Sequence, residues 1–348
     1  MIDEIKNQQN QNMIEASHPL FQLVHPNHNN NFSEMSGLEL QELLYYLDHY
    51  YLELRNHLGF DESITFGLEL EFEHVKRKQL KMNLSKLEQR QQWELKHDFA
   101  LEDGEEIVSP ILKDTPTTWN DLKQVCSMIS GSAVINQKSG GHIHIGTQVL
   151  GNQTSAWLNF MKLWSVYENV IYRFTYGEYL CERFGINRYA IPVTKSFWQD
   201  YLAFVSQESL NLDSMLGRIS RVRNQAVNFN NVKDFDEMKP RNTIEFRCPN
   251  GTLEPVIWQN NVNLFVHLLE YSKSSNYDHE LIQKRRILNE DKYASLEWYR
   301  EIYLQQALEL CDMIFTNNLD KIYFLRQYLK SFEIGNQELE HAKIFVKK

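Results

Sequence analysis

The sequence predicts an α+β fold with a largely antiparallel sheet and a helical C-terminal region. Short segments alternate apolar and polar residues in the pattern of half-buried strands, as in FGLELEFEHV, WELKHDFAL, EEIVSPIL, GGHIHIG and NTIEFR. Asp103-Gly104 separates two of these segments, which is a hairpin signal. The strands and helices do not form regular βαβ units, and the chain after Gly251 is mostly helix-like. That order favours an antiparallel sheet with separate helices.

The sequence pattern near the N-terminus predicts a leader followed by a helix. Residues 1–35 are rich in Asn, Gln and His and lack periodicity, so we expect a poorly ordered leader. Ser36 and Glu39 have the spacing of a capping box, which begins an amphipathic helix that should end near Gly59. Strand-like alternation then begins at Thr65.

Two later helices complete the predicted core. Residues 117–130 favour a helix, and 154–177 favour a long helix with an aromatic stripe typical of a buried face. The stripe consists of Trp157, Phe160, Trp164, Tyr167 and Ile171. We divide the chain into the leader, a core over 36–255, and a helical region over 256–348 packed on that core.

Composition narrows the range of partners. The chain has 348 residues and a net charge of -10, which disfavours nucleic acid because such partners usually need a basic face. No apolar run is long enough to suggest a membrane span, and the N-terminus lacks a signal core. The four cysteines form no CxxC pair, so they are interpreted as free thiols in a reducing compartment. We expect a cytoplasmic protein without a membrane partner.

Three predicted strands carry charged or metal-binding side chains at positions i and i+2. Because side chains alternate across a strand, each pair points to one face of the sheet. The pairs are Glu69 with Glu71, His142 with His144, and Glu245 with Arg247. The opposite face would be apolar and consist of Leu68, Leu70, Phe72, Ile143, Ile145, Ile244, Phe246 and Cys248. We therefore expect one core-directed face and one face that gathers the ionisable side chains, Glu73 included.

Each pair has an ordinary explanation as well as a functional one. Alternating glutamates are common on the solvated face of an antiparallel strand. A His-x-His pair can simply be hydrogen-bonded, and a Glu-x-Arg pair can be an ion pair. Together, however, the three pairs supply carboxylates, imidazole and a guanidinium suited to phosphate. Clustered carboxylates repel unless a cation lies among them. The set therefore favours Mg²⁺ or Mn²⁺ with a nucleotide over structural zinc.

Two further carboxylates flank the predicted hairpin turn. An antiparallel hairpin brings Asp98 and Glu106 close together, with Glu105 pointing the other way. Taken alone, Asp98 is better explained as a surface carboxylate near a turn. The chain contains no P-loop, no G-x-S-x-G elbow and no H-E-x-x-H helix, so other nucleotide, hydrolase and metalloprotease sites are unsupported.

In this order, the blocks GLELEFE, HDFALEDGEEIVSP, GGHIHIG and NTIEFR resemble the carboxylate–amine ligases of the glutamine synthetase and glutamate–cysteine ligase superfamily. The amidoligase group is the most similar, and the resemblance covers roughly residues 64–255. It implies a curved, glutamine synthetase-type antiparallel sheet with helices on its outer face. The N-terminal β-grasp domain and the ammonia-site loop of glutamine synthetase are not found, so specificity for glutamate or ammonia is not transferred.

The resemblance also implies roles for individual residues. The implied metal ligands are Glu69, Glu71, Asp98, Glu106, His142 and Glu245. Arg247 would clamp the transferring phosphate, and His144 would lie near the phosphates or the substrate. Arg223 and Asn228 match a weaker block near the substrate, with Arg223 counted among the catalytic residues and Asn228 among the nucleotide contacts.

The activity implied is an ATP- and Mg²⁺-dependent ligation in which a carboxylate becomes an acyl phosphate and an amine then displaces phosphate. Small-molecule or peptide carboxylates and amines would be the substrates. Two alternatives stay open, namely a non-catalytic member that binds nucleotide or peptide, and a phosphotransferase acting on guanidines. The sequence leaves the substrates, the residue that deprotonates the amine, the roles of the leader and the C-terminal helices, and the oligomeric state open.

Overall fold

The computed structural model describes residues 28–50, 52–85, 93–98, 101, 103–205, 212–219, 222–232, 242–293, 295 and 297–330. Most of the predicted leader therefore lies outside the described residues. Its last part is anchored, because Phe32 is buried and the backbone N–H groups of Phe32 and Ser33 donate to the Asp312 carboxylate. None of the helices in the described ranges has the length and apolar character needed to cross a bilayer.

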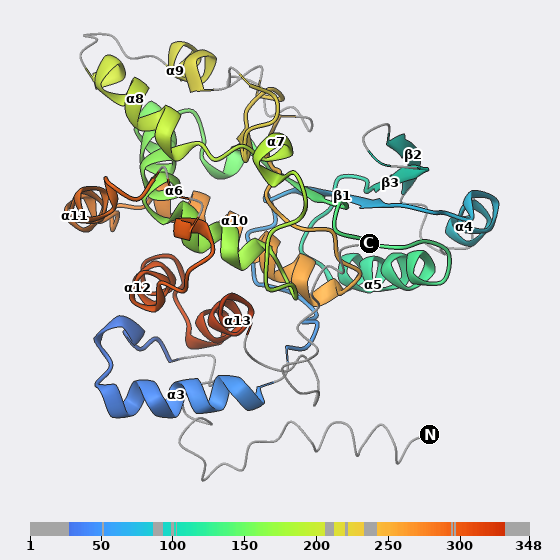
Figure 1. The fold of residues 1–348 in the computed structure, drawn as a ribbon, viewed down its shortest axis with the longest axis horizontal. Helices are drawn as coiled ribbons and strands as arrows, with labels where there is room; N and C mark the ends of the chain where they lie inside the picture. The colour runs from blue at the N-terminus through green and yellow to red at the C-terminus, as the bar shows by residue number, and fades with distance from the viewer. Residues whose placement is uncertain are drawn as a thin grey trace.

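The described elements alternate strands and helices before a helical C-terminal region (Figure 1). The strands are β1 (Phe66–Phe72), β2 (Glu94–Asp98), β3 (Gly104–Val108), β4 (Gly141–Gly146), β5 (Val227–Asn228) and β6 (Thr243–Phe246). The helices up to β6 are η1 (Phe32–Glu34), α3 (Gly37–His49), α4 (Arg77–Leu84), α5 (Pro116–Ser130), η2 (Thr147–Val149), α6 (Thr154–Thr175), α7 (Ile186–Tyr189), α8 (Thr194–Val205) and α9 (Leu212–Ile219). After β6 follow α10 (Pro255–Lys273), α11 (His279–Asn289), η3 (Glu297–Tyr299), α12 (Leu304–Ile314) and α13 (Asn318–Leu329).

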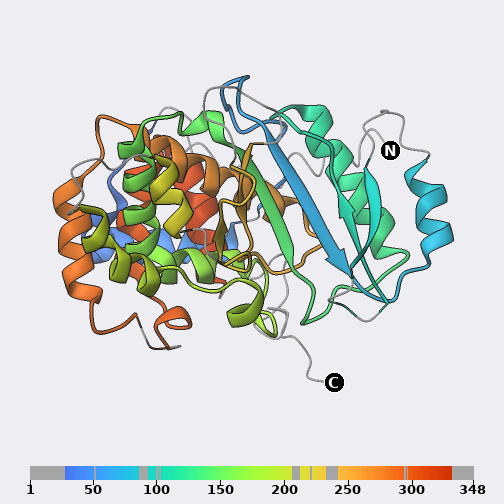
Figure 2. The same ribbon diagram turned by 90° about the horizontal axis from the view of Figure 1, so that it is seen from above.

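The six strands form one antiparallel sheet in the order β2-β3-β1-β4-β6-β5. The α+β class and the antiparallel sheet are therefore confirmed. The strongly curved sheet that the resemblance implies is not confirmed, since the sheet is not strongly curled (Figure 2). Its outer strands are short, so they extend the sheet sideways without wrapping around either face.

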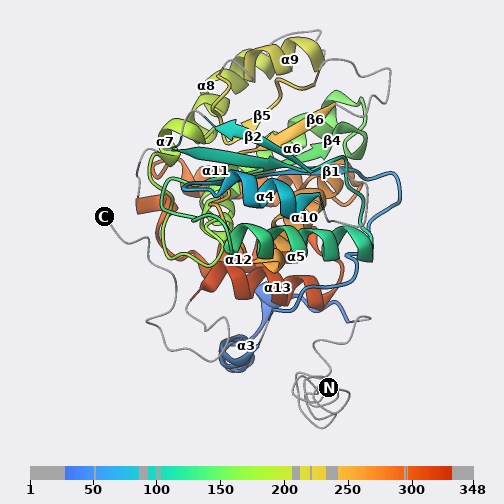
Figure 3. The ribbon, with the colours of Figure 1, turned by 90° about the vertical axis from the view of Figure 1, so that its right-hand side faces the viewer.

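The apolar face of the sheet forms the core, as the alternation predicts. Leu68, Leu70, Phe72, Ile143, Ile145, Ile244, Phe246 and Cys248 are all buried. Phe246 stacks on Phe265 of α10 with ring centroids 4.0 Å apart, and Phe66 stacks on Trp119 of α5. Figure 3 shows α5 and α10 beneath the sheet, on the side opposite α8 and α9. The buried aromatic stripe of α6 joins this layer, since Trp164 also packs against Phe246.

The first predicted helix begins where expected and ends early. Both hydrogen bonds of the capping box form between Ser36 and Glu39. The helix ends at His49 rather than near Gly59. The backbone just past it bonds to other helices: the Tyr50 carbonyl accepts from Arg326 of α13, and the N–H of Arg55 donates to Gln259 of α10. Farther along, the Asp114 carboxylate accepts from the N–H groups at 58–60. These groups are therefore not available to extend the helix.

The hairpin is confirmed with a longer connection than a two-residue turn. Asp98 pairs with Gly104, so residues 99–103 join β2 to β3. Asp103 has a positive φ of 47°, a conformation that Asp tolerates better than most residues. Gly104 is required by space, since a Cβ there would lie 2.2 Å from the Leu101 Cβ. Asp98 and Glu106 therefore share a face of the hairpin.

Candidate active and metal-binding site

One cavity of about 770 Å³ lies over the polar face of the sheet. It is lined by all ten residues that the sequence singles out: Glu69, Glu71, Asp98, Glu106, His142, His144, Arg223, Asn228, Glu245 and Arg247. These residues come from β1, β2, β3, β4, β5, β6 and the segments flanking the last two strands. The alternation of the strands thus brings together side chains that are far apart in the sequence.

Strand register places the site residues directly beside one another. Glu69 pairs with His142 across β1 and β4, and Glu71 pairs with Glu106 across β1 and β3. On the other side of β4, His144 pairs with Glu245 of β6. Directly opposed side chains on one face have Cβ atoms about 5 Å apart. The register therefore concentrates carboxylates and imidazoles at the centre of the sheet.

Glu69 lies between the two histidines. His142 Nδ1 donates to Glu69 Oε2 at 2.9 Å, and His144 Nε2 donates to Glu69 Oε1 at 3.1 Å. Burial opposes the charge of Glu69, but these hydrogen bonds outweigh it and hold the pKa of the carboxyl well below its usual range. Burial also opposes charge on His144, yet the bond to Glu69 raises the pKa of its imidazole. Glu69 is therefore ionised at neutral pH.

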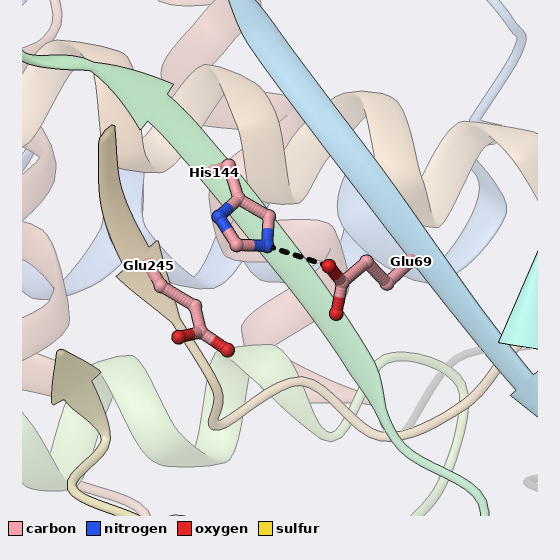
Figure 4. A group of neighbouring side chains, drawn as sticks. All are labelled: Glu69, His144 and Glu245. Carbon is pink, nitrogen blue, oxygen red and sulfur yellow. Dashed lines mark hydrogen bonds and ion pairs between the residues drawn. The ribbon is translucent and has the colours of Figure 1, made fainter. Parts of the chain in front are cut away.

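Glu69, His144 and Glu245 form a group that could hold a cation. One ligand atom from each of these residues lies within 4.8 Å of the others, and Figure 4 shows the three side chains converging from β1, β4 and β6. Two carboxylates and one imidazole suit Mg²⁺ or Mn²⁺. A bound cation would replace the hydrogen bond that now joins Glu69 to His144.

His142 adds a ring nitrogen to this cluster. Its Nε2 atom is buried without a hydrogen-bond partner and lies 3.3 Å from Glu71 Oε1. Nδ1 already donates to Glu69, so Nε2 is the ring atom left to bind a ligand beside the carboxylates. The donor set therefore fits a metal ion.

Glu106 adds a carboxylate with altered acidity. Burial, reinforced by the negative charge of Glu69, raises the pKa of Glu106 to about 7. Asp98 contributes further repulsion in the same direction. A cation in the cavity would relieve this repulsion and favour the charged carboxylate.

Arg247 and its neighbours form another side of the cavity. Its Nη1 contacts the Glu245 carboxylate, and its Nε donates to the Tyr189 carbonyl at 3.2 Å. Asn228 Nδ2 donates to Glu245 Oε2 at 2.7 Å, so Asn228 orients a carboxylate. Arg223 is exposed on the cavity wall. Arg247 would have to exchange Glu245 for a phosphoryl group in order to clamp it.

The structure departs from the expected polar face at two places. Glu73 follows the end of β1 and does not line the cavity, because its carboxylate accepts from the Asn136 side chain. Arg183, which carries no strand pattern in the sequence, is buried in the cavity wall next to Glu71. Lys138, Tyr189 and Phe184 also line the cavity without having been predicted. Only the tertiary fold brings these residues to the site.

The fold and site define an α+β protein that gathers carboxylates, imidazoles and guanidinium groups in one cavity of its sheet. A model of the family described as "Putative amidoligase enzyme" matches residues 84–269, which is more than half of the chain. The chain belongs to this family, and the resemblance to amidoligases is confirmed. The matched stretch contains every predicted site residue except Glu69 and Glu71. No curated protein matches the chain.

Proposed function

We propose that the protein is an ATP- and Mg²⁺-dependent ligase that joins a carboxylate to an amine. The observation that supports this proposal is the shared cavity, where Glu69, His144 and Glu245, which could hold a cation, lie next to the Arg247 guanidinium. Membership of the amidoligase family supports amide-bond formation as the outcome. The open polar face of the antiparallel sheet would be used as in the glutamine synthetase superfamily.

The proposed ligands of the cations are the cavity-facing acidic residues and the first histidine of β4. They are Glu69, Glu71, Asp98, Glu106, His142 and Glu245. Bound Mg²⁺ or Mn²⁺ would neutralise the charge of the ATP phosphates. His144, whose imidazole shares the possible cation position with Glu69 and Glu245, would hold Glu69 in place near the phosphates, and Asn228 keeps Glu245 aimed at the cluster.

We propose that the reaction proceeds in two steps, phosphoryl transfer followed by attack of the amine. A substrate carboxylate oxygen forms a bond to the γ-phosphorus of ATP while the bond to the β,γ-bridging oxygen breaks, giving an acyl phosphate and ADP. The amine then bonds to the acyl carbon, phosphate leaves with the carbon–oxygen bonding pair, and the ammonium loses a proton. Arg247 would stabilise the charge on the transferring phosphoryl group, and Arg223 on the cavity wall would contact the substrate.

Hydroxylamine offers a test that does not require the natural amine. It intercepts acyl phosphates as hydroxamates, so a panel of carboxylates with ATP and Mg²⁺ should yield hydroxamate and ADP in equal amounts for the accepted carboxylate. We expect Arg247→Ala and Glu69→Gln each to lower this rate at least about 100-fold with the fold intact. Near-normal turnover in Arg247→Ala would refute the clamp.

Two outcomes would redirect the assignment. Calorimetric binding of ATP and Mg²⁺ without ADP formation, across a broad panel of carboxylates and amines, would favour a non-catalytic binding protein. Phosphate transfer to guanidines without hydroxamate formation would favour a guanidino phosphotransferase. Hydroxamate formation supports the ligase over both.

A further inference from the structure

Arg183 connects three segments of the site from a buried position. Its side chain is 2% exposed, and it reaches the cavity from the loop before α7. Nη2 donates to the backbone carbonyl of Arg247 at 2.9 Å, at the end of β6. Nη1 lies 3.6 Å from Glu71 Oε2 on β1. One guanidinium therefore spans β1 and the residue that follows β6.

The loop that carries Arg183 is itself held in place. The backbone N–H of Arg183 donates to the Asn250 side chain, and Asn250 Nδ2 donates to the Cys181 carbonyl. The N–H of Phe184 donates to the Gln137 carbonyl. Hydrogen bonds on both sides thus fix the position from which the guanidinium enters the cavity wall.

The chain approaching β4 leaves room for this guanidinium. A Cβ at Gly140 would lie 1.1 Å from Arg183 Nη1 and 2.4 Å from its Cζ. Any other residue at Gly140 would expel the guanidinium from its place. The backbone N–H of Gly140 also donates to Glu71 Oε2 at 2.6 Å.

The two oxygens of Glu71 therefore have separate partners. Oε2 is held by the Gly140 N–H and faces the positive charge of Arg183. Oε1 lies 3.3 Å from the unpartnered Nε2 of His142. The Gly140 N–H and the Arg183 guanidinium thus hold one oxygen of Glu71 and leave the other facing the imidazole.

We propose that Arg183 is a positioning residue that orients Glu71 as a metal ligand and holds the Arg247 backbone beside it. This inference rests on the proposed function, because it assigns Arg183 a role in the same metal site. Arg183 acts through Glu71 and the Arg247 main chain, and no contact between Arg183 and substrate is invoked.

Mn²⁺ binding followed by electron paramagnetic resonance tests this role without a turnover assay. Arg183→Met keeps the aliphatic stem and removes the charge, so we expect at least a tenfold weaker Mn²⁺ affinity. Arg183→Lys restores a charge near Glu71 and should recover most of the loss. Should Arg183→Met fail to fold, Arg183→Gln is the second neutral variant, since its amide can still donate to the Arg247 carbonyl.

A double variant tests whether Arg183 acts through Glu71. In the Glu71→Gln background, the carboxylate that Arg183 orients is absent, so adding Arg183→Met should weaken Mn²⁺ binding no more than twofold further. Arg300→Ala is the matched control, because it removes a half-exposed arginine paired with Glu182, the neighbour of Arg183. That control should bind Mn²⁺ like the wild type.

The outcomes separate this inference from the proposed function. If the wild type binds Mn²⁺ and Arg183→Met binds it with the same affinity, the role of Arg183 is overturned, while the proposed function is not. The role of Arg183 is also overturned if Arg183→Met and Arg183→Lys lose the same amount of Mn²⁺ affinity. Additive losses of affinity in the double variant would overturn it as well. A wild-type protein that binds no Mn²⁺ with or without ATP would overturn both.

Discussion

The two faces of the central sheet differ in burial and in chemistry. On the apolar face, Leu70 and Phe246 are at most 1% exposed. On the cavity face, Glu71 and Glu245 are 9% and 6% exposed, and the side chains of Glu69 and His144 are 23% and 16% exposed. The difference lies in what covers each face, since helices α5, α6 and α10 cover one and a cluster of mutually bonded polar groups faces the cavity.

Along each strand, a side chain that packs in the core is followed by one that faces the cavity, because side chains alternate between the two faces. Burying apolar side chains against helices stabilises the fold. Burying carboxylates together costs free energy unless partners compensate them. Adjacent residues such as Phe246 and Arg247 should therefore respond to substitution in opposite ways.

The largest stability effect should come from the apolar face. Phe246 stacks on Phe265 and packs against Phe160 and Trp164, so Phe246→Ala would leave a large cavity among these rings. We expect a loss of about 3–5 kcal/mol in the free energy of unfolding. Urea denaturation checks this, with Arg247→Ala compared in parallel. If both variants lose the same free energy of unfolding, the apolar face does not stabilise the fold more than the cavity face does.

A smaller and pH-dependent effect should come from Glu106 on the cavity face. Its pKa is about 7 in the folded protein against the ordinary value of 4.5, because of burial and then the charge of Glu69. The folded state thus binds this proton more tightly than the unfolded chain. Its contribution to stability is fully present below pH 4.5 and is lost as the pH rises through about 7.

Glu106→Gln isolates that contribution. The metal-free wild type should lose stability relative to this variant between about pH 4.5 and 7, and the difference should stay constant at higher pH. Urea denaturation at a series of pH values in the presence of a chelator measures it. A difference that does not change with pH would show that Glu106 titrates normally.

The smallest effect should come from a glutamate that shares the strand pattern but not the cavity. Glu73→Gln keeps the shape of the side chain that contacts Asn136, outside the cavity. We expect Mn²⁺ affinity and hydroxamate formation within twofold of the wild type, in contrast to Glu69→Gln on the same strand. A loss comparable to that of Glu69→Gln would place Glu73 in the site after all.

Alternation predicted which strand side chains share a face, and the three pairs Glu69 with Glu71, His142 with His144, and Glu245 with Arg247 line one cavity. Arg223 and Asn228, which also line it, were expected only from the family resemblance. Alternation failed where tertiary contacts override local pattern. Glu73 follows the same alternation, yet it lies past the end of β1. The first helix ends at His49, where the backbone that follows bonds to α13 and α10 instead. Arg183 could not be predicted, since its place depends on the space above Gly140.

The order of the strands also has a consequence for how the chain reaches its native state. Glu69 meets His142 across 73 residues, and His144 meets Thr243 across 99. Contacts between residues this distant require a large loop to close first. Closing the loop lowers the conformational entropy of the chain before the contact forms, so we expect slow folding. During synthesis, β4 has no partner on one edge until β6 has left the ribosome. We expect the nascent chain to expose that edge and to depend on protection from aggregation until then.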